Sequence, residues 1–289
     1  MSFVTKEKRF IILQVTCVVI FAGRAWQHLF WDAPFRSILW DQALLEDFVL
    51  RHLEMDWNEY ATDVRIDNNI QRFIQCTGVL FALSAISVFT IKKYIKLSTG
   101  IITLGIFILM LTAFASFKTK FFQIGEWLEF GTQIFSPVIY LLLIHKILSH
   151  KKLITLAKIA IAITFIGHGF YAFGYYPQPG NYVDMVINIT GSQEDLVRAF
   201  LRLVGTLDFT AAILIFIPNT NKPALVYCIF WGFLTAAARI VSLFDFDFAL
   251  QTLHQSLHLT VYRLSHSLLP LWVLVETLRM NTNYDSSKK

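Results

Sequence analysis

Residues 97–117 read LSTGIITLGIFILMLTAFASF, a run of 21 residues without a charged side chain between Lys96 and Lys118. A helix needs about 20 predominantly apolar residues to cross about 30 Å of hydrocarbon. The run does not alternate between apolar and polar residues, as a membrane-spanning strand does. It therefore predicts a transmembrane helix and sets the class of fold.

Seven further stretches have the same character, and together they predict an all-α, polytopic transmembrane helical bundle. Backbone groups in lipid must form hydrogen bonds within their own segment, which favours helices. The apolar part of the first stretch has the length of a signal-peptide core. The residues that follow it, Arg24 to Trp31, are bulky and do not form the small-residue pattern of a cleavage site, so we expect a retained helix. The eight spans are predicted at residues 10–30, 73–91, 97–117, 121–144, 153–176, 196–217, 223–244 and 257–278.

The composition agrees with a protein whose solvent is largely lipid. Hydrophobic residues make up 55% of the 289 residues and charged residues only 16%, against about 25% charged residues in soluble domains. The sequence has no basic stripe with interleaved aromatic residues, so it does not indicate nucleic-acid binding. The three cysteines have no CxxC spacing, and His254 and His258 lack an evident third ligand, so we expect no metal site.

The loops differ in charge, and this difference predicts the orientation in the membrane. Lys and Arg gather on the cytoplasmic side of membrane proteins, and here they predict cytoplasmic N and C termini in a multi-pass protein of the cell inner (plasma) membrane. The loop at 31–69, on the other side, holds nine Asp and Glu residues. The basic residues of the first side are Lys6, Lys8, Arg9, Lys92, Lys93, Lys96, Lys146, Lys151, Lys152, Lys222, Arg279, Lys288 and Lys289.

A weak internal repeat divides the chain into two four-helix halves related by an axis along the membrane normal. Phe21-Ala22-Gly23-Arg24 matches Phe165-Ile166-Gly167-His168, and Gln133-x-x-x-Pro137 matches His266-x-x-x-Pro270. Several residues of the span at 73–91, among them Gly78, match residues of the span at 196–217, among them Gly205, at one constant offset. The repeat predicts a first half at 1–150 with the long acidic outer loop at 31–69, a second half at 151–280, and a cytoplasmic tail at 281–289.

Polar and charged residues of the spans share one depth. With a rise of about 1.5 Å per residue, nearly all of them fall in the outer half of the membrane, where ionisable side chains usually face a wet cavity or one another. We therefore predict a polar chamber, although interhelical ion pairs that only fix the bundle explain the same pattern. The candidates for ligand binding are Arg24, Gln133, Arg202, Asp208, Arg239 and Arg263, and those for moving protons are Glu126, Glu129, His168 and His266.

The outer loop has apolar residues at near-helical spacing from Ile38 to Leu53, with acidic residues between them. This pattern predicts an amphipathic helix at the outer interface. Such a helix either packs on the bundle or covers the chamber as a lid. A second segment of this kind is expected from Asp245 to His258.

The second half resembles the DoxX-like membrane proteins. The resemblance is carried by Gly167-His168-Gly169-Phe170, Ala172-Phe173-Gly174, Leu203-Val204-Gly205-Thr206-Leu207-Asp208, and Trp231-Gly232-x-x-Thr235-Ala236 with Arg239; the stretch from Gly23-Arg24 to Leu39-Trp40-Asp41 resembles the front of larger members. It implies a link to quinones, because the family takes its name from a subunit of a thiosulfate:quinone oxidoreductase. A more distant similarity is to the membrane part of vitamin K-dependent carboxylase-like (HTTM) proteins, although the predicted chamber has no lysine to serve as a strong base.

Three functions are compatible with these features. The first is a redox-associated subunit that holds a quinone or similar lipid in the chamber and works with a membrane-bound redox partner. The second is a transporter or lipid-handling protein without chemistry, which the apolar inner halves of the spans disfavour. The third is a membrane scaffold that docks a partner through its outer loop. In each case the lipid bilayer is a partner and nucleic acid is not.

Overall fold

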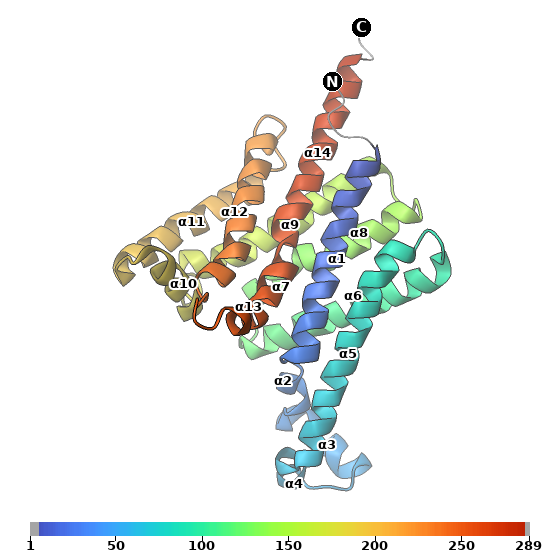
Figure 1. Ribbon diagram of the computed structural model, residues 1–289, viewed down its shortest axis with the longest axis vertical. Helices are drawn as coiled ribbons and strands as arrows, with labels where there is room; N and C mark the ends of the chain where they lie inside the picture. The colour runs from blue at the N-terminus through green and yellow to red at the C-terminus, as the bar shows by residue number, and fades with distance from the viewer. Residues whose placement is uncertain (1–5, 287–289) are drawn as a thin grey trace.

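The computed structural model describes the backbone of residues 6–286 and the side chains of residues 10–280, and all regular secondary structure within these ranges is α-helical (Figure 1). This confirms the predicted all-α class. The helices are α1 (Lys6–Phe30), α2 (Arg36–Leu39), α3 (Gln42–His52), α4 (Trp57–Thr62), α5 (Val64–Thr90), α6 (Ile95–Thr119), α7 (Ile124–Glu129), α8 (Gly131–Ile144), α9 (His150–Phe173), α10 (Gly180–Thr190), α11 (Glu194–Leu214), α12 (Asn221–Val241), α13 (Ala249–Arg263) and α14 (Ser265–Ser286).

Six segments of the described chain are long and apolar enough to cross a membrane, as expected of an integral membrane protein. They are Phe10–Phe30, Val64–Thr90, Ile95–Thr119, Ile124–Ile144, His150–Phe173 and Asn221–Val241. The other two predicted spans, 196–217 and 257–278, fall on α11 and on α13 with α14, which are not among these six segments. The count of eight spans therefore stays a prediction.

Two of the predicted spans are not straight helices. The span at 121–144 breaks at Phe130, between α7 and α8, and the span at 257–278 breaks at Leu264, between α13 and α14. The breaks lie seven residues before Pro137 and six residues before Pro270, the two prolines that the repeat matches. At the first break the Thr132 amide donates to Thr164 Oγ1 of α9 at 2.8 Å, so its hydrogen bond is replaced by one between helices.

Glycine contacts reproduce the repeat in three dimensions. Gly23 of α1 lies against the backbone of Tyr262 and His258, and Gly167 of α9 lies against the backbone of Glu129 and Gly125. Because Gly23 matches Gly167, and Tyr262 and His258 lie 133 residues after Glu129 and Gly125, these are equivalent contacts. They support the repeat, while the division into halves at residue 150 stays a prediction.

The outer loop forms three short helices rather than one amphipathic helix. The predicted helix from Ile38 to Leu53 is interrupted at Trp40 and Asp41, since Asp41 accepts a hydrogen bond from the Leu44 amide and begins α3 as an N-cap. Lys118 at the end of α6 forms an ion pair with Asp41, and Ser37 Oγ donates to the Ala115 carbonyl of α6 at 3.0 Å. The segment that holds α2–α4 is therefore anchored to the C-terminal end of α6 and lies beside the N-terminal end of α5 (Figure 1).

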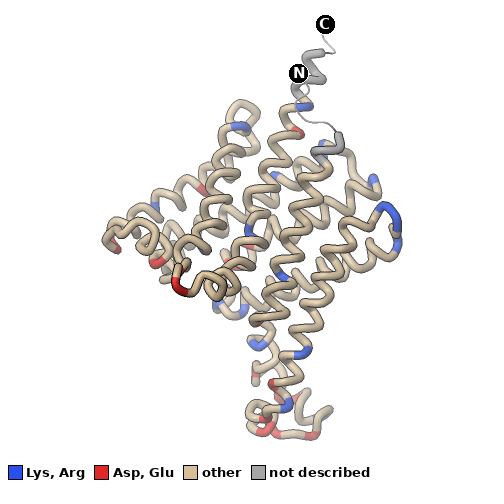
Figure 2. The backbone as a smooth tube through the Cα atoms, in the orientation of Figure 1, with Lys and Arg blue, Asp and Glu red and all other residues tan. Residues whose placement is uncertain are grey.

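Charged residues separate along the molecule (Figure 2). Lys residues lie in the connections after α5 and α8 and in the first turn of α12, whereas Asp and Glu are frequent in the segment of α2–α4, in the first turn of α11 and after α12. Of the second predicted amphipathic segment, from Asp245 to His258, the part from Ala249 onward is helical and belongs to α13, which continues to Arg263; its place at the outer interface stays a prediction. At the other end, α14 continues through Ser286 into the predicted tail at 281–289, and residues 287–289 lie outside the described part of the chain.

Gly205→Ala is expected to destabilise the protein, because its Cβ would clash with the backbone nitrogen of Phe173 in α9. Overpacking of this kind costs about 1–3 kcal/mol. Thermal unfolding followed by tryptophan fluorescence measures the loss. Gly100→Ala is the control, since nothing lies within 4 Å of its Cβ position; equal melting temperatures for the two variants would contradict the close contact.

Asp41→Asn and Asp41→Ala are expected to expose α2–α4 to protease, and the alanine variant more so because it also loses the N-cap. The Lys118 ammonium holds the pKa of Asp41 below its usual value. The ion pair therefore contributes above the usual Asp pKa and is lost only as the pH falls through the lowered one. Pepsin cleavage between about pH 5 and pH 2 measures this: the wild type starts more resistant than Asp41→Asn and approaches it at the lowest pH. Equal cleavage of both at pH 5 is the contrary outcome.

Candidate functional site

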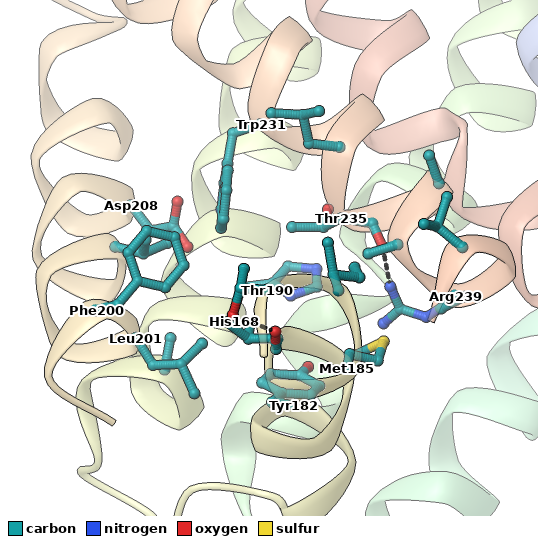
Figure 3. A pocket seen from close by; sticks show the side chains of 18 residues that line it. His168, Tyr182, Met185, Thr190, Phe200, Leu201, Asp208, Trp231, Thr235 and Arg239 are labelled. Carbon is teal, nitrogen blue, oxygen red and sulfur yellow. Dashed lines mark hydrogen bonds between the residues drawn. The ribbon is translucent and has the colours of Figure 1, made fainter. Parts of the chain in front are cut away.

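A cavity of about 340 Å³ lies between α10, α11 and α12, with α9 behind it (Figure 3). Most of its wall is apolar, and it includes Phe200, Val204, Trp231 and Leu234. Several wall residues are exposed where α10, α11 and α12 face outward, so the cavity opens between these helices. It has the composition of a site for a molecule that is mostly apolar with a few polar groups.

Two opposite charges reach the cavity from different sides (Figure 3). Asp208 of α11 is 1% exposed and accepts a hydrogen bond of 2.7 Å from the Tyr227 hydroxyl. Arg239 of α12 is 6% exposed and donates to the carbonyl of Thr235 in its own helix. No ion pair joins Asp208 to Arg239 among the described side chains, so the cavity wall holds two separate ionisable groups.

A network of uncharged and acidic groups lies behind the cavity. The Tyr182 hydroxyl of α10 donates to Glu129 Oε1 at 2.9 Å, and His168 Nδ1 lies 3.7 Å from the same oxygen. Burial raises the pKa of Tyr182, so its hydroxyl stays protonated as the donor. The rings of His168 and His266 meet edge to face at 5.1 Å, and His266 Nδ1 lies 2.7 Å from Thr132 Oγ1.

A second polar group lies between α1, α8 and α13. The Arg24 guanidinium donates to Gln133 Oε1 through Nε (3.1 Å) and Nη2 (2.7 Å), and to Gln27 through Nη1 (2.8 Å). Its centre lies 3.9 Å from the centroid of the Tyr262 ring. The Tyr262 hydroxyl accepts a hydrogen bond from Arg263, so this one side chain contacts two guanidinium groups.

The structure brings most of the predicted site residues together. Arg239 joins His168 and Asp208 at the cavity, while Glu129 and His266 contact His168 behind it. Arg24 and Gln133 form the second group with Arg263. Glu126 is half-buried and lies within electrostatic range of Arg263.

Arg202 is the exception among the predicted ligand-binding residues. It is exposed on α11 and does not line the cavity. The buried face of α11 is formed by Leu201, Val204, Gly205 and Asp208, at positions i, i+3, i+4 and i+7, so Arg202 lies outside this face.

Three tyrosines were not predicted from the sequence. Tyr182 binds Glu129, Tyr227 binds Asp208, and Tyr262 lies between Arg24 and Arg263. Their neutral side chains give no charge signal in an apolar stretch. For Tyr262, the adjacent charged residue Arg263 is the feature of the sequence that could have indicated a polar contact. The outer helices α2–α4 contribute nothing to the cavity wall; α10 covers it instead.

No metal centre is formed within residues 10–280, where no group of three or more His, Cys, Asp or Glu side chains is placed to hold an ion. Comparison with known proteins gives no match to a family model, to a curated protein or to a solved structure. The site is therefore interpreted from its geometry.

Gln133→Leu is expected to destabilise the protein by about 1–3 kcal/mol or more, because it leaves the buried Arg24 guanidinium without two of its hydrogen bonds. Arg24→Met combined with Gln133→Leu removes both partners, and we expect it to recover part of the loss. Chemical or thermal unfolding of the two single variants and the double variant completes the cycle. Strictly additive effects would show that the pair does not interact.

Proposed function

We propose that the protein binds a membrane lipid in the cavity between α10, α11 and α12. By lipid we mean an amphiphile with a long apolar part and a carbonyl or acidic head. The observation that carries this proposal is the combination of an apolar wall with polar side chains grouped at His168, Tyr182 and Arg239. Such a site holds the apolar part by burial and orients the head through a few directed hydrogen bonds.

The opening of the cavity supports entry from the bilayer. Phe200 of α11, and Leu234 and Val241 of α12, line the cavity and are at least 40% exposed. Large apolar side chains at a cavity entrance are costly in water and favourable in hydrocarbon. A lipid can therefore reach the polar groups without crossing an aqueous phase.

A quinone is one such lipid, and the resemblance to DoxX-like proteins favours it. The residues present fit it: the apolar wall suits an isoprenoid tail, and Arg239 and His168 are groups that can donate hydrogen bonds to a carbonyl oxygen. A bound quinone would supply reversible two-electron chemistry. His168 and Glu129, 3.7 Å apart, are positioned to move protons beside it, and a membrane-bound redox partner would exchange the electrons.

The proposal includes the finer topology. We propose that α11 and α14 cross the membrane together with the six apolar segments, which gives eight spans. Both termini then lie in the cytoplasm, and the protein resides in the cell inner membrane. The separation of Lys and Arg from Asp and Glu supports this orientation (Figure 2). The charges that lower the apolar content of α11 include Asp208, which is buried at the cavity rather than exposed to lipid.

Val204→Trp is expected to fill the cavity and to abolish retention of the lipid, because Val204 is buried in the cavity wall. Gentle purification, lipid extraction and mass spectrometry measure retention, and an ultraviolet spectrum of the extract detects a quinone. Leu203→Trp is the matched control, since Leu203 is 59% exposed on the neighbouring position.

A second variant tests the same cavity in case Val204→Trp does not fold. Leu234→Trp narrows the opening at an exposed position and is also expected to reduce retention. Equal lipid content in the wild type and in both cavity variants would overturn the proposed function.

A further inference from the structure

Arg239 is a buried cation without a counter-ion. Its side chain forms part of the cavity wall (Figure 3), and within the described structure its hydrogen bond goes to the carbonyl of Thr235, one turn away in the same helix. A guanidinium group has five N–H donors. No second hydrogen bond from Arg239 is found among the described residues, so most of its N–H donors have no protein acceptor there.

The nearby carboxylates are engaged elsewhere. Glu129 accepts from Tyr182 and faces His168, and Asp208 accepts from Tyr227 on the other side of the cavity. Among the described side chains, the ion pairs formed by Glu129 and by every other acid do not include Arg24, Arg239 or Arg263. Three guanidinium groups thus share one region without a direct ion pair.

An arrangement of this kind has an electrostatic cost. A buried charge is expensive unless it is paired, and Arg239 and Arg263 also repel each other. Glu126 and Glu129, the acids nearest to Arg263, offset at most two of the three positive charges of Arg24, Arg239 and Arg263. Asp208 does not offset the third, because it lies across the cavity from Arg239 and is hydrogen-bonded to Tyr227. A further negative charge beside Arg239 would balance the group, and planar oxyanions match the guanidinium fork with two parallel hydrogen bonds.

We infer that the lipid bound in this cavity carries an anionic head, a carboxylate or a phosphate, that pairs with Arg239 while its chain follows the apolar wall. This inference rests on the lipid binding proposed above and adds the charge of the ligand to it. It separates a fatty acid or an acidic phospholipid from a neutral quinone, which shares the apolar tail but lacks the charge.

The test compares two anionic lipids with a neutral one; oleate and oleyl alcohol have the same chain and differ only in the head, and phosphatidate carries two such chains on a glycerol phosphate. The full chain is reconstituted in phosphatidylcholine nanodiscs at neutral to mildly alkaline pH, and binding of oleate, oleyl alcohol and dioleoyl phosphatidate is measured by competition with labelled oleate. We expect oleate or phosphatidate to bind at least tenfold more tightly than oleyl alcohol. Preference for oleate identifies a fatty acid as the source of the anion, and preference for phosphatidate identifies an acidic phospholipid.

Arg239→Gln should lower the affinity for the anionic lipid at least tenfold and change that for oleyl alcohol by less than about twofold. Arg239→Lys keeps the charge and should retain part of the preference, which distinguishes loss of charge from loss of packing. Arg72→Gln, at an exposed position of α5 outside the cavity wall, should leave all affinities unchanged.

The outcomes separate the two proposals. Equal binding of oleate, phosphatidate and oleyl alcohol to the wild type overturns the anionic head and leaves lipid binding standing. The same conclusion follows if Arg239→Gln keeps the full preference for the anion. Absence of binding of all three lipids overturns the proposed function itself and the inference with it.

Discussion

The close approach of helices at Gly23 and Gly167 is the constraint on which the site depends. A Cβ at either position would lie 2.7 Å from backbone atoms of the opposing helix, Tyr262 N for Gly23 and Gly125 O for Gly167. Small residues permit such contacts between membrane helices, where dispersion forces rather than the hydrophobic effect hold the helices together. The residue after each glycine, Arg24 or His168, is thereby held against Tyr262 or Glu129. A larger residue at either glycine would separate the groups that make up the polar region.

The same scaffold carries different chemistry on its two sides. Arg24 binds Gln133 between α1 and α8, and the matching residues His168 and His266 meet between α9 and α14. Thr132 Oγ1 and Ser265 Oγ, which also match in the repeat, lie 3.3 Å from each other. Contact between equivalent residues is what a two-fold axis produces. Around this point α1 and α8 contribute a hydrogen-bonded guanidinium group, whereas α9 and α14 contribute histidines beside an open cavity. The positions are shared, and the identities of the side chains differ.

The sequence predicts the helices well because the length and apolar content of a span are local properties. The apolar runs at 10–30, 97–117 and 153–176 correspond to α1, α6 and α9 within a few residues. The polar candidates were found because charged groups are conspicuous in apolar runs. The breaks at Phe130 and Leu264 were not predicted; the first is accompanied by a hydrogen bond from the Thr132 amide to Thr164 of another helix, which a local pattern does not show. Arg202 was misplaced since depth alone does not determine which face of α11 packs inward. Tyr182 and α10 were missed because the stretch after Pro179 forms a helix of only 11 residues, which is too short to be recognised as a membrane span.

The sideways opening of the cavity has a consequence for how such a site fills. Under the proposed lipid binding, molecules that enter between α10, α11 and α12 arrive by diffusion within the bilayer, so the fraction of protein occupied follows the mole fraction of the ligand among the surrounding lipids. Aqueous solubility then sets no limit, and a sparingly soluble compound can saturate the site. Detergent monomers, which carry the same kind of tail, compete for the same apolar wall. The composition of the host bilayer thus becomes part of the binding equilibrium.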